Sequence, residues 1–163
     1  MNLQPDFRSN PGFNVVGIER YTENGIASIH EAWDGFGKRS TEIQHLVKPV
    51  ICYGFEDYSR DFVMQPRAFP KYYYIASYEV ESLNDIPAGM VGKDVAAANY
   101  AVFTYRGSIS GLPKFFQFIY GDWLPASGYK MDPAMMCDFE RYPEPVTDME
   151  NALVEIWVAV VEK

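Results

Sequence analysis

The sequence predicts an α+β fold in which two β-α-β-β units follow one another along the chain. Short stretches of alternating or β-branched and aromatic residues indicate strands. Two longer stretches carry apolar residues three and four positions apart, as on one face of a helix. These elements occur twice in the same order, which is typical of an internal repeat. We therefore expect antiparallel sheets with both helices on one face.

The first unit follows a polar segment, 1–12, that holds two prolines and is expected to form a lead-in without an element of its own. Residues 24–43 predict a helix with one apolar face, made of Ile26, Ile29, Trp33 and Phe36. Strands are predicted at 13–22, 50–58 and 72–80. A connector rich in Gly, Pro, Asn and Asp follows at 83–94 and separates the two units.

The second unit predicts a helix at 110–128, and its first turn accommodates Pro113 because the missing N–H costs little there. The apolar face of this helix would hold Leu112, Phe115, Phe116, Ile119 and Trp123. Strands are predicted at 99–107, 135–143 and 154–162.

Two sequence matches support the repeat. Aligning GFEDYS (54–59) with DFERYP (138–143) matches Phe55 with Phe139, Glu56 with Glu140 and Tyr58 with Tyr142. Residues 73–81 match 155–163 at nearly the same offset. We expect one domain over 13–163, with repeats at about 13–82 and 95–163 related by a pseudo-twofold axis. The helices would cover one face, and a ligand groove would lie on the other.

The composition favours a pocket for flat or cationic ligands over a nucleic-acid surface. Aromatic residues make up 16% of the chain; they can fill a core, and their ring faces also attract cations. The net charge is −8, and no run of Lys and Arg exceeds two residues. Because nucleic-acid binding requires a basic surface, we expect no direct contact with DNA or RNA.

Metal and membrane binding are not expected. Cys52 and Cys137 do not form a CxxC pair, and His30 and His45 have no metal-ligand spacing. The sequence shows neither an N-terminal signal nor an apolar run of roughly 18 residues. A cytoplasmic protein with reduced cysteines and no cofactor is the expectation.

Glu140 is the candidate functional residue, because a lone carboxylate in an otherwise apolar strand is costly unless it is paired or neutralised. If Phe139 packs under the helices, alternation of side chains directs Glu140 into the groove. There, a cationic ligand could complete its pairing. The alternatives are a solvated strand face, or an ion pair with Arg141 or Arg106.

The order of elements, the stretch at 100–129 ending in WLPASGY, and the following DFERYP together resemble the GyrI-like, or AraC-type, effector-binding domain, over about residues 13–161. This resemblance implies a pocket for hydrophobic cationic drugs with a glutamate in the penultimate strand, here Glu140, as counter-ion. It also implies aromatic walls. The candidates are Trp33, Tyr53, Phe55, Tyr74, Tyr105 and Trp157, while Trp123 is expected in the core.

Residues 1–12 are too short for a DNA-binding domain, so the resemblance is to stand-alone members such as those in integron cassettes. A role in transcription would then need a DNA-binding protein in trans, or the protein could sequester its ligand. Two alternatives stay open. One is a hydrolase of strained aromatic molecules with Glu140 as general base. The other is a protein-interaction module, for example one that binds gyrase.

Overall fold

The structure is a computed structural model that describes residues 3–163. The elements up to residue 80 are β1 (Asp6–Asn10), β2 (Phe13–Tyr21), α1 (Ile26–Arg39), a 3₁₀ turn (Ser40–Glu42), β3 (Cys52–Asp57) and β4 (Tyr73–Val80). The remainder are β5 (Val91–Val95), β6 (Ala98–Gly107), a 3₁₀ turn (Ile109–Gly111), α2 (Leu112–Phe118), a π-helical turn (Ile119–Trp123), α3 (Leu124–Ala126), β7 (Tyr129–Met131), β8 (Cys137–Tyr142) and β9 (Ala152–Glu162).

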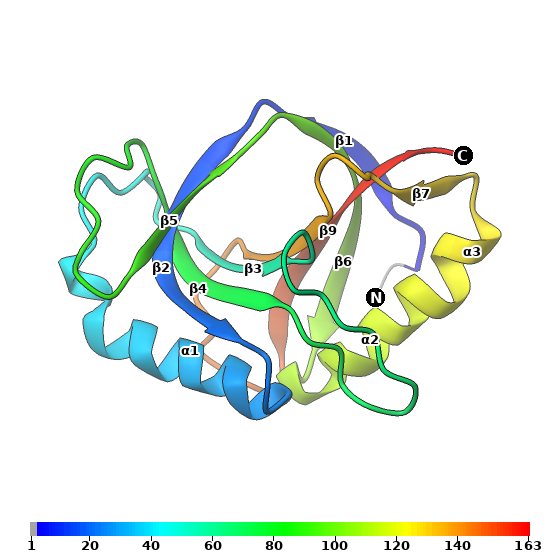
Figure 1. Cartoon of the computed structure of the whole chain (residues 1–163), viewed down its shortest axis with the longest axis horizontal. Coiled ribbons are helices and arrows are strands. Elements are labelled where there is room, and N and C mark those ends of the chain that lie inside the picture. The colour runs from blue at the N-terminus through cyan, green and yellow to red at the C-terminus, as the bar shows by residue number, and fades with distance from the viewer. Residues whose placement is uncertain (1–2) are drawn as a thin grey trace.

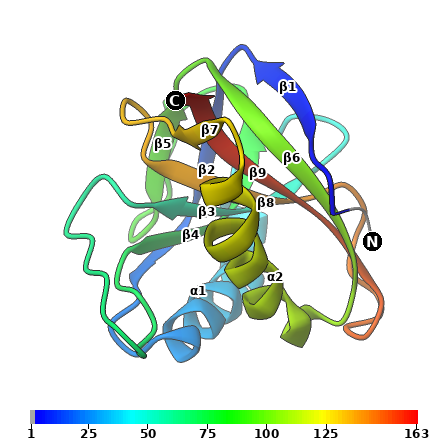
Figure 2. The ribbon, with the colours of Figure 1, turned by 90° about the vertical axis from the view of Figure 1, so that its right-hand side faces the viewer.

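Within the described residues, the strands form a curved antiparallel sheet in the order β1-β6-β9-β8-β3-β4-β2-β5, and β7 pairs with the end of β9. Helices α1 and α2 lie on the same side of this sheet, each under a different half of it (Figure 1, Figure 2). The predicted α+β class and the antiparallel pairing with helices on one face are confirmed.

Three short strands were not predicted from the sequence. Residues 6–10 form β1, so the expectation that 1–12 hold no element is wrong; residues 1 and 2 lie outside the described part. Strand β5 (Val91–Val95) overlaps the end of the predicted connector at 83–94, and β7 has three residues. Strands β1 and β5 are the two ends of the sheet and pair on one side only. Side chains there are largely exposed or half-buried, so no apolar alternation marks them.

The two halves share one order of elements and one pattern of pairing. The series β2-α1-β3-β4 recurs as β6-α2-β8-β9, and in each half the last strand lies between the other two. The halves join where β3 pairs with β8, with Phe55 directly opposite Phe139. The spatial twofold relation between the halves stays a prediction.

The helix-bearing face of the sheet holds two apolar clusters. Under α1 lie Val16, Ile18, Tyr74 and Ala76, in contact with Ala32 and Phe36 of the helix. Under α2 lie Phe103, Val154, Ile156 and Val158, in contact with Leu112, Phe115 and Ile119. The predicted face of the second helix is confirmed, with Trp123 packed against this cluster. On the first helix, Ile26 is 39% exposed, and Ser28 and Ala32 are buried in its place.

The opposite, inner face of the curved sheet is filled by a separate core. Its aromatic members are Tyr53, Phe55, Tyr100, Phe139 and Trp157, with Phe13 packed against them. The prediction that Phe139 lies under the helices, with Glu140 on the other face, is therefore wrong. Alternation along β8 shows which side chains share a face, but which face the helices cover depends on how the whole sheet curves.

Candidate functional site

Three buried carboxylates lie on the helix-bearing face at the junction of β3 and β8. Glu56, Asp138 and Glu140 are 4%, 0% and 6% exposed. In the strand pairing, Glu56 is opposite Asp138, and Glu140 is opposite Gly54. Because residues two apart on a strand point to the same side, Asp138 and Glu140 share that face with Glu56. We call these three residues, together with the side chains that hydrogen-bond around them, the acid site; those side chains are Trp33, Tyr58, Tyr74, Tyr120 and Tyr142.

Glu140 is held from the side of α1. The Tyr74 hydroxyl donates to its Oε1 over 2.8 Å, and the Tyr142 hydroxyl donates to its Oε2 over 2.7 Å. The indole Nε1 of Trp33 donates to the Tyr74 oxygen over 2.8 Å. A chain of hydrogen bonds therefore runs from α1 through β4 to β8.

Gly54 provides the room for this arrangement. A Cβ on Gly54 would lie 2.0 Å from the Tyr74 hydroxyl oxygen and 3.0 Å from Oε1 of Glu140. The absence of a side chain at position 54 thus allows the Tyr74 ring to cross β3 and reach Glu140 on the next strand.

Asp138 is held from the side of α2. Its Oδ2 accepts hydrogen bonds from Tyr120 and, over 2.7 Å, from Tyr58. The Tyr58 hydroxyl also lies 2.8 Å from Oε2 of Glu56. One hydroxyl proton can serve only one of these oxygens at a time, so a proton on either carboxyl group completes the arrangement.

Tyr120 reaches Asp138 from the π-helical turn that follows α2. Such a turn holds one residue more than an α-helical turn and is found frequently at functional sites. Tyr120 does not belong to the apolar stripe predicted for this helix, which explains why helical periodicity missed it.

The carboxylates of the acid site bind protons more tightly than usual. Burial, then the charges of Asp138 and Glu140, raises the pKa of Glu56 well above its ordinary value. Burial raises the pKa of Asp138 to about 7, and it also raises the pKa of Glu140. Hydrogen bonds from Tyr142, Tyr74 and Glu56 oppose the rise at Glu140. We infer that Glu56 is the protonated member and donates to Glu140.

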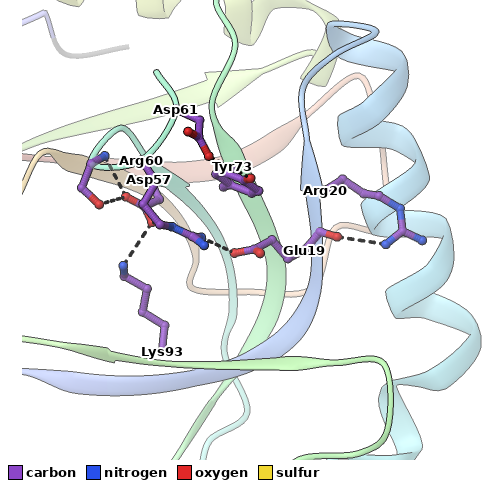
Figure 3. Close-up of polar contacts among 8 residues, drawn as sticks. Glu19, Arg20, Asp57, Arg60, Asp61, Tyr73 and Lys93 are labelled. Atoms are coloured by element: carbon purple, nitrogen blue, oxygen red, sulfur yellow. Dashed lines mark hydrogen bonds and ion pairs between the residues drawn. The ribbon is translucent and has the colours of Figure 1, made fainter. Parts of the chain in front are cut away.

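Asp57, the residue after Glu56, has the opposite environment. Its side chain is also buried, but Lys93 and Arg60 lie 3.2 Å and 3.1 Å from its Oδ2 (Figure 3). Burial would raise the pKa of Asp57, but hydrogen bonds from Ser59 and the charge of Lys93 hold it below its usual value. Among the ion pairs of residues 3–163, none includes Glu56, Asp138 or Glu140. Basic side chains therefore neutralise Asp57 but not the acid site.

Of the site residues predicted from the sequence, the structure brings three together: Glu140, Trp33 and Tyr74. Tyr53, Phe55 and Trp157 lie on the inner face of the sheet, around Phe139. Tyr105 packs on Phe115 of α2, and its hydroxyl donates to the Ser108 carbonyl oxygen.

The acid site also contains residues that the sequence reasoning did not single out: Glu56, Tyr58, Asp138, Tyr120 and Tyr142. The sequence carried a signal for three of them, because the repeat alignment matches Glu56 with Glu140 and Tyr58 with Tyr142. Asp138 was on the same predicted strand face as Glu140.

Aromatic rings cover the acid site. Trp33 and Tyr142, both half-buried, meet edge to face with centroids 5.6 Å apart above Glu140. A surface groove of about 470 Å³ lies elsewhere, beside β1 and β7, and none of its lining residues belongs to the acid site. Access to Glu140 therefore requires movement of these rings.

In the described part of the chain, no helix is long and apolar enough to span a membrane. No group of His, Cys, Asp or Glu within residues 3–163 is arranged to hold a metal ion.

Three comparisons with known proteins bear on the site. Residues 8–160 match the family described as "integron-associated effector binding protein". The transcriptional regulator BrlR of Pseudomonas aeruginosa is 32% identical over 143 residues, which is 88% of this chain and 49% of that protein. The chain thus spans about half the length of this relative.

Two solved structures share the fold. The integron cassette protein VCH_CASS2 from the mobile metagenome of Vibrio cholerae has a TM-score of 0.67 at 19% identity, covering 97% of this chain and 96% of that one. SAV2435, solved with tetraphenylphosphonium bound, has a TM-score of 0.70 at 18% identity, covering 97% and 94%.

Proposed function

Since the chain belongs to the family of integron-associated effector-binding proteins, we propose that it binds a hydrophobic cationic aromatic compound at the acid site, with Glu140 as counter-ion. The observation that carries this proposal is a cluster of buried carboxylates that no basic side chain of residues 3–163 neutralises. A cationic guest would supply the missing positive charge, and surrounding ring faces would add cation–π attraction.

Trp33, Tyr74 and Tyr142 are the proposed walls around Glu140, since they already contact it or one another. Opening of the Trp33–Tyr142 pair would admit the ligand between α1 and α2. Tyr53, Phe55 and Trp157 lie in the inner core, so we assign them to packing. Tyr105 lies on the other face, under α2, and we assign it to packing as well.

As a ligand-binding domain, the protein would sense or sequester its ligand. The similarity to BrlR, a transcriptional regulator of about twice the length, supports a link to transcription. The binding of tetraphenylphosphonium by SAV2435 supports a lipophilic cation as the ligand class. The net charge of −8 disfavours direct contact of these residues with nucleic acid, so a regulatory role would use a DNA-binding domain or partner other than this domain.

The test is binding of tetraphenylphosphonium and rhodamine-like cations, with neutral isosteres of the same shape, to the wild type and to Glu140→Gln. We expect the wild type to select the cations and the variant to lose about 30-fold or more in affinity, because a desolvated charge pair contributes at least ~2 kcal/mol. Glu155→Gln is the matched control, since Glu155 pairs with Arg141 away from the acid site.

Tryptophan fluorescence locates the ligand. Quenching that Trp33→Phe abolishes would place the ligand beside α1. Equal binding of cations and neutral isosteres, or full affinity in Glu140→Gln, would refute the proposal. Turnover of a strained aromatic electrophile that Glu140→Gln abolishes would instead favour the hydrolase with Glu140 as base.

A further inference from the structure

The half of the acid site near α2 holds an unused hydrogen-bond acceptor. Asp138 is 0% exposed, and its Oδ2 accepts from Tyr58 and Tyr120. Its other oxygen, Oδ1, is buried and has no partner among the described residues. Buried polar atoms are nearly always hydrogen-bonded, so this oxygen indicates a partner that the chain itself does not supply.

The neighbouring side chains leave this oxygen to a donor. The Tyr120 hydroxyl is directed to Oδ2, and the Tyr58 hydroxyl lies between Oδ2 and Oε2 of Glu56, so neither is directed to Oδ1. The two other buried polar groups nearby, Glu56 and Glu140, are carboxyl groups and engage each other. An N–H group carrying positive charge satisfies both the unpaired oxygen and the excess of acid around it.

The spacing allows one ligand to reach both acids. Asp138 and Glu140 are two residues apart on β8 and point to the same side, which separates them by about 6–7 Å along the strand. A single cationic group that lies between the two acids can donate its N–H to one and remain in charge contact with the other, while the ring system packs against the aromatic side chains.

Resting on the cation-binding function proposed above, we propose that Oδ1 of Asp138 is a second binding point in the same site, which accepts a hydrogen bond from the ligand. The site would then prefer protonated amines, amidines or guanidines to cations that lack N–H. Tetraphenylphosphonium and quaternary ammonium ions would bind through Glu140 alone, whereas N–H cations would use both carboxyl groups.

The experiment uses two probes with one skeleton, dimethyl(pyrenylmethyl)ammonium, which has one N–H, and trimethyl(pyrenylmethyl)ammonium, which has none. Their dissociation constants are measured by pyrene and tryptophan fluorescence at neutral pH on the full chain. We expect the wild type to bind the N–H probe about tenfold or more tightly, as for one hydrogen bond to a charged group. Equal affinities, or tighter binding of the quaternary probe, would overturn the inference.

The two probes differ in the N–H group and also in the size of one extra methyl group. The variant Asp138→Asn shows which of these two differences causes the difference in affinity. The Asn carbonyl oxygen would take the hydrogen bonds from Tyr58 and Tyr120, so its amide N–H₂ would occupy the place of Oδ1 and face the ligand as a donor. We expect the ratio of the two affinities to fall by about tenfold in this variant. An unchanged ratio in a folded variant would overturn the inference, and the wild-type ratio decides alone if the variant does not fold.

The second binding point at Asp138 and the cation-binding function can be refuted separately. If both probes bind, and Glu140→Gln weakens both equally, but the wild type shows no N–H preference, only the second binding point is refuted. If neither probe binds, or Glu140→Gln has no effect on either, the proposed function itself is refuted.

Discussion

Glu56 and Glu140 are two matched residues of the predicted repeat, and they have different roles in the acid site. Glu140 accepts hydrogen bonds from Tyr74 and Tyr142 and carries the proposed charge. Glu56 shares the Tyr58 hydroxyl with Asp138 and is the more strongly neutralised of the two, because burial and its acidic neighbours raise its pKa well above the usual range. A neutral donor beside a charged acceptor is the arrangement that two adjacent buried carboxyl groups favour.

Glu56→Gln should therefore stabilise the ligand-free protein in mild alkali, since a Gln amide can donate to Glu140 and leave its carbonyl oxygen beside the shared Tyr58 hydroxyl, as protonated Glu56 does. A carboxyl group whose pKa rises on folding stabilises the native state fully below its unfolded value near 4, and this stability is lost as the pH rises through the folded value. The wild type should thus lose stability as the pH rises from about 4 through the raised pKa values of the acid site. One of these values, the pKa of Asp138, is about 7.

The measurement is the melting temperature at acidic and mildly alkaline pH. The variant should lose less than the wild type and melt about 3 °C higher at mildly alkaline pH, which corresponds to ~1 kcal/mol for a domain of this size. Glu155→Gln, outside the acid site, serves as the control. A pH dependence as steep as that of the wild type would contradict the protonation of Glu56.

At the scale of elements, the acid site depends on the central pair β3 and β8 and on two departures from regular pattern. Gly54 removes a side chain from β3 so that Tyr74 of β4 reaches Glu140 of β8. The π-helical turn after α2 places Tyr120 on Asp138. Neither departure is needed to form a strand or a helix, which supports a functional reason for both.

Gly54→Ala should destabilise the fold and weaken cation binding together. Its Cβ would lie 2.0 Å from the Tyr74 hydroxyl oxygen, so this fully buried ring must shift and lose its hydrogen bonds to Glu140 and Trp33. We expect a loss of about 1–3 kcal/mol in the free energy of unfolding by urea titration. Gly37→Ala on α1 is the control: nothing lies within 4 Å of its Cβ, so it should stabilise by up to ~1 kcal/mol. Equal stabilities of the two variants would argue against the role of Gly54.

At the scale of the whole molecule, the halves of the chain meet at the acid site. One half contributes Trp33, Glu56 and Tyr74, and the other contributes Tyr120 and the carboxylates of β8. Both helices lie on the same side of the sheet (Figure 2), and the acid site receives Trp33 from α1 and Tyr120 from the turn after α2. A ligand that enters between the helices would therefore touch both halves and stabilise the domain as one unit.

Cation affinity should rise with pH. A cation favours the ionised form of the acid site, so it competes with protons whose pKa values burial has raised. For tetraphenylphosphonium, which does not titrate, affinity should increase through about pH 7 and then level off, with protons released on binding. Calorimetry in two buffers of different ionisation enthalpy measures this release. Binding that neither releases protons nor depends on pH would contradict the link between the acid site and the ligand.

Much of the fold could be predicted from the sequence because the long elements carry their own pattern. The predicted strands became β2, β3, β4, β6, β8 and β9, and both helices formed close to the expected positions. The resemblance to effector-binding domains is confirmed by the family match over residues 8–160. Strands β1, β5 and β7 were missed because their stability comes from pairing with distant neighbours rather than from local alternation.

By itself, the sequence determined the α+β class, the order of the elements, the excess of aromatic residues and the unusual position of Glu140 in its strand, since each of these depends on residues close together in the chain. Only the tertiary structure decided which face of the sheet the helices cover, and therefore that Phe139 lies in the inner core while Glu140 meets Trp33 and Tyr74. It also decided that Glu56 and Asp138 join Glu140, because the register between β3 and β8 depends on how the whole chain packs.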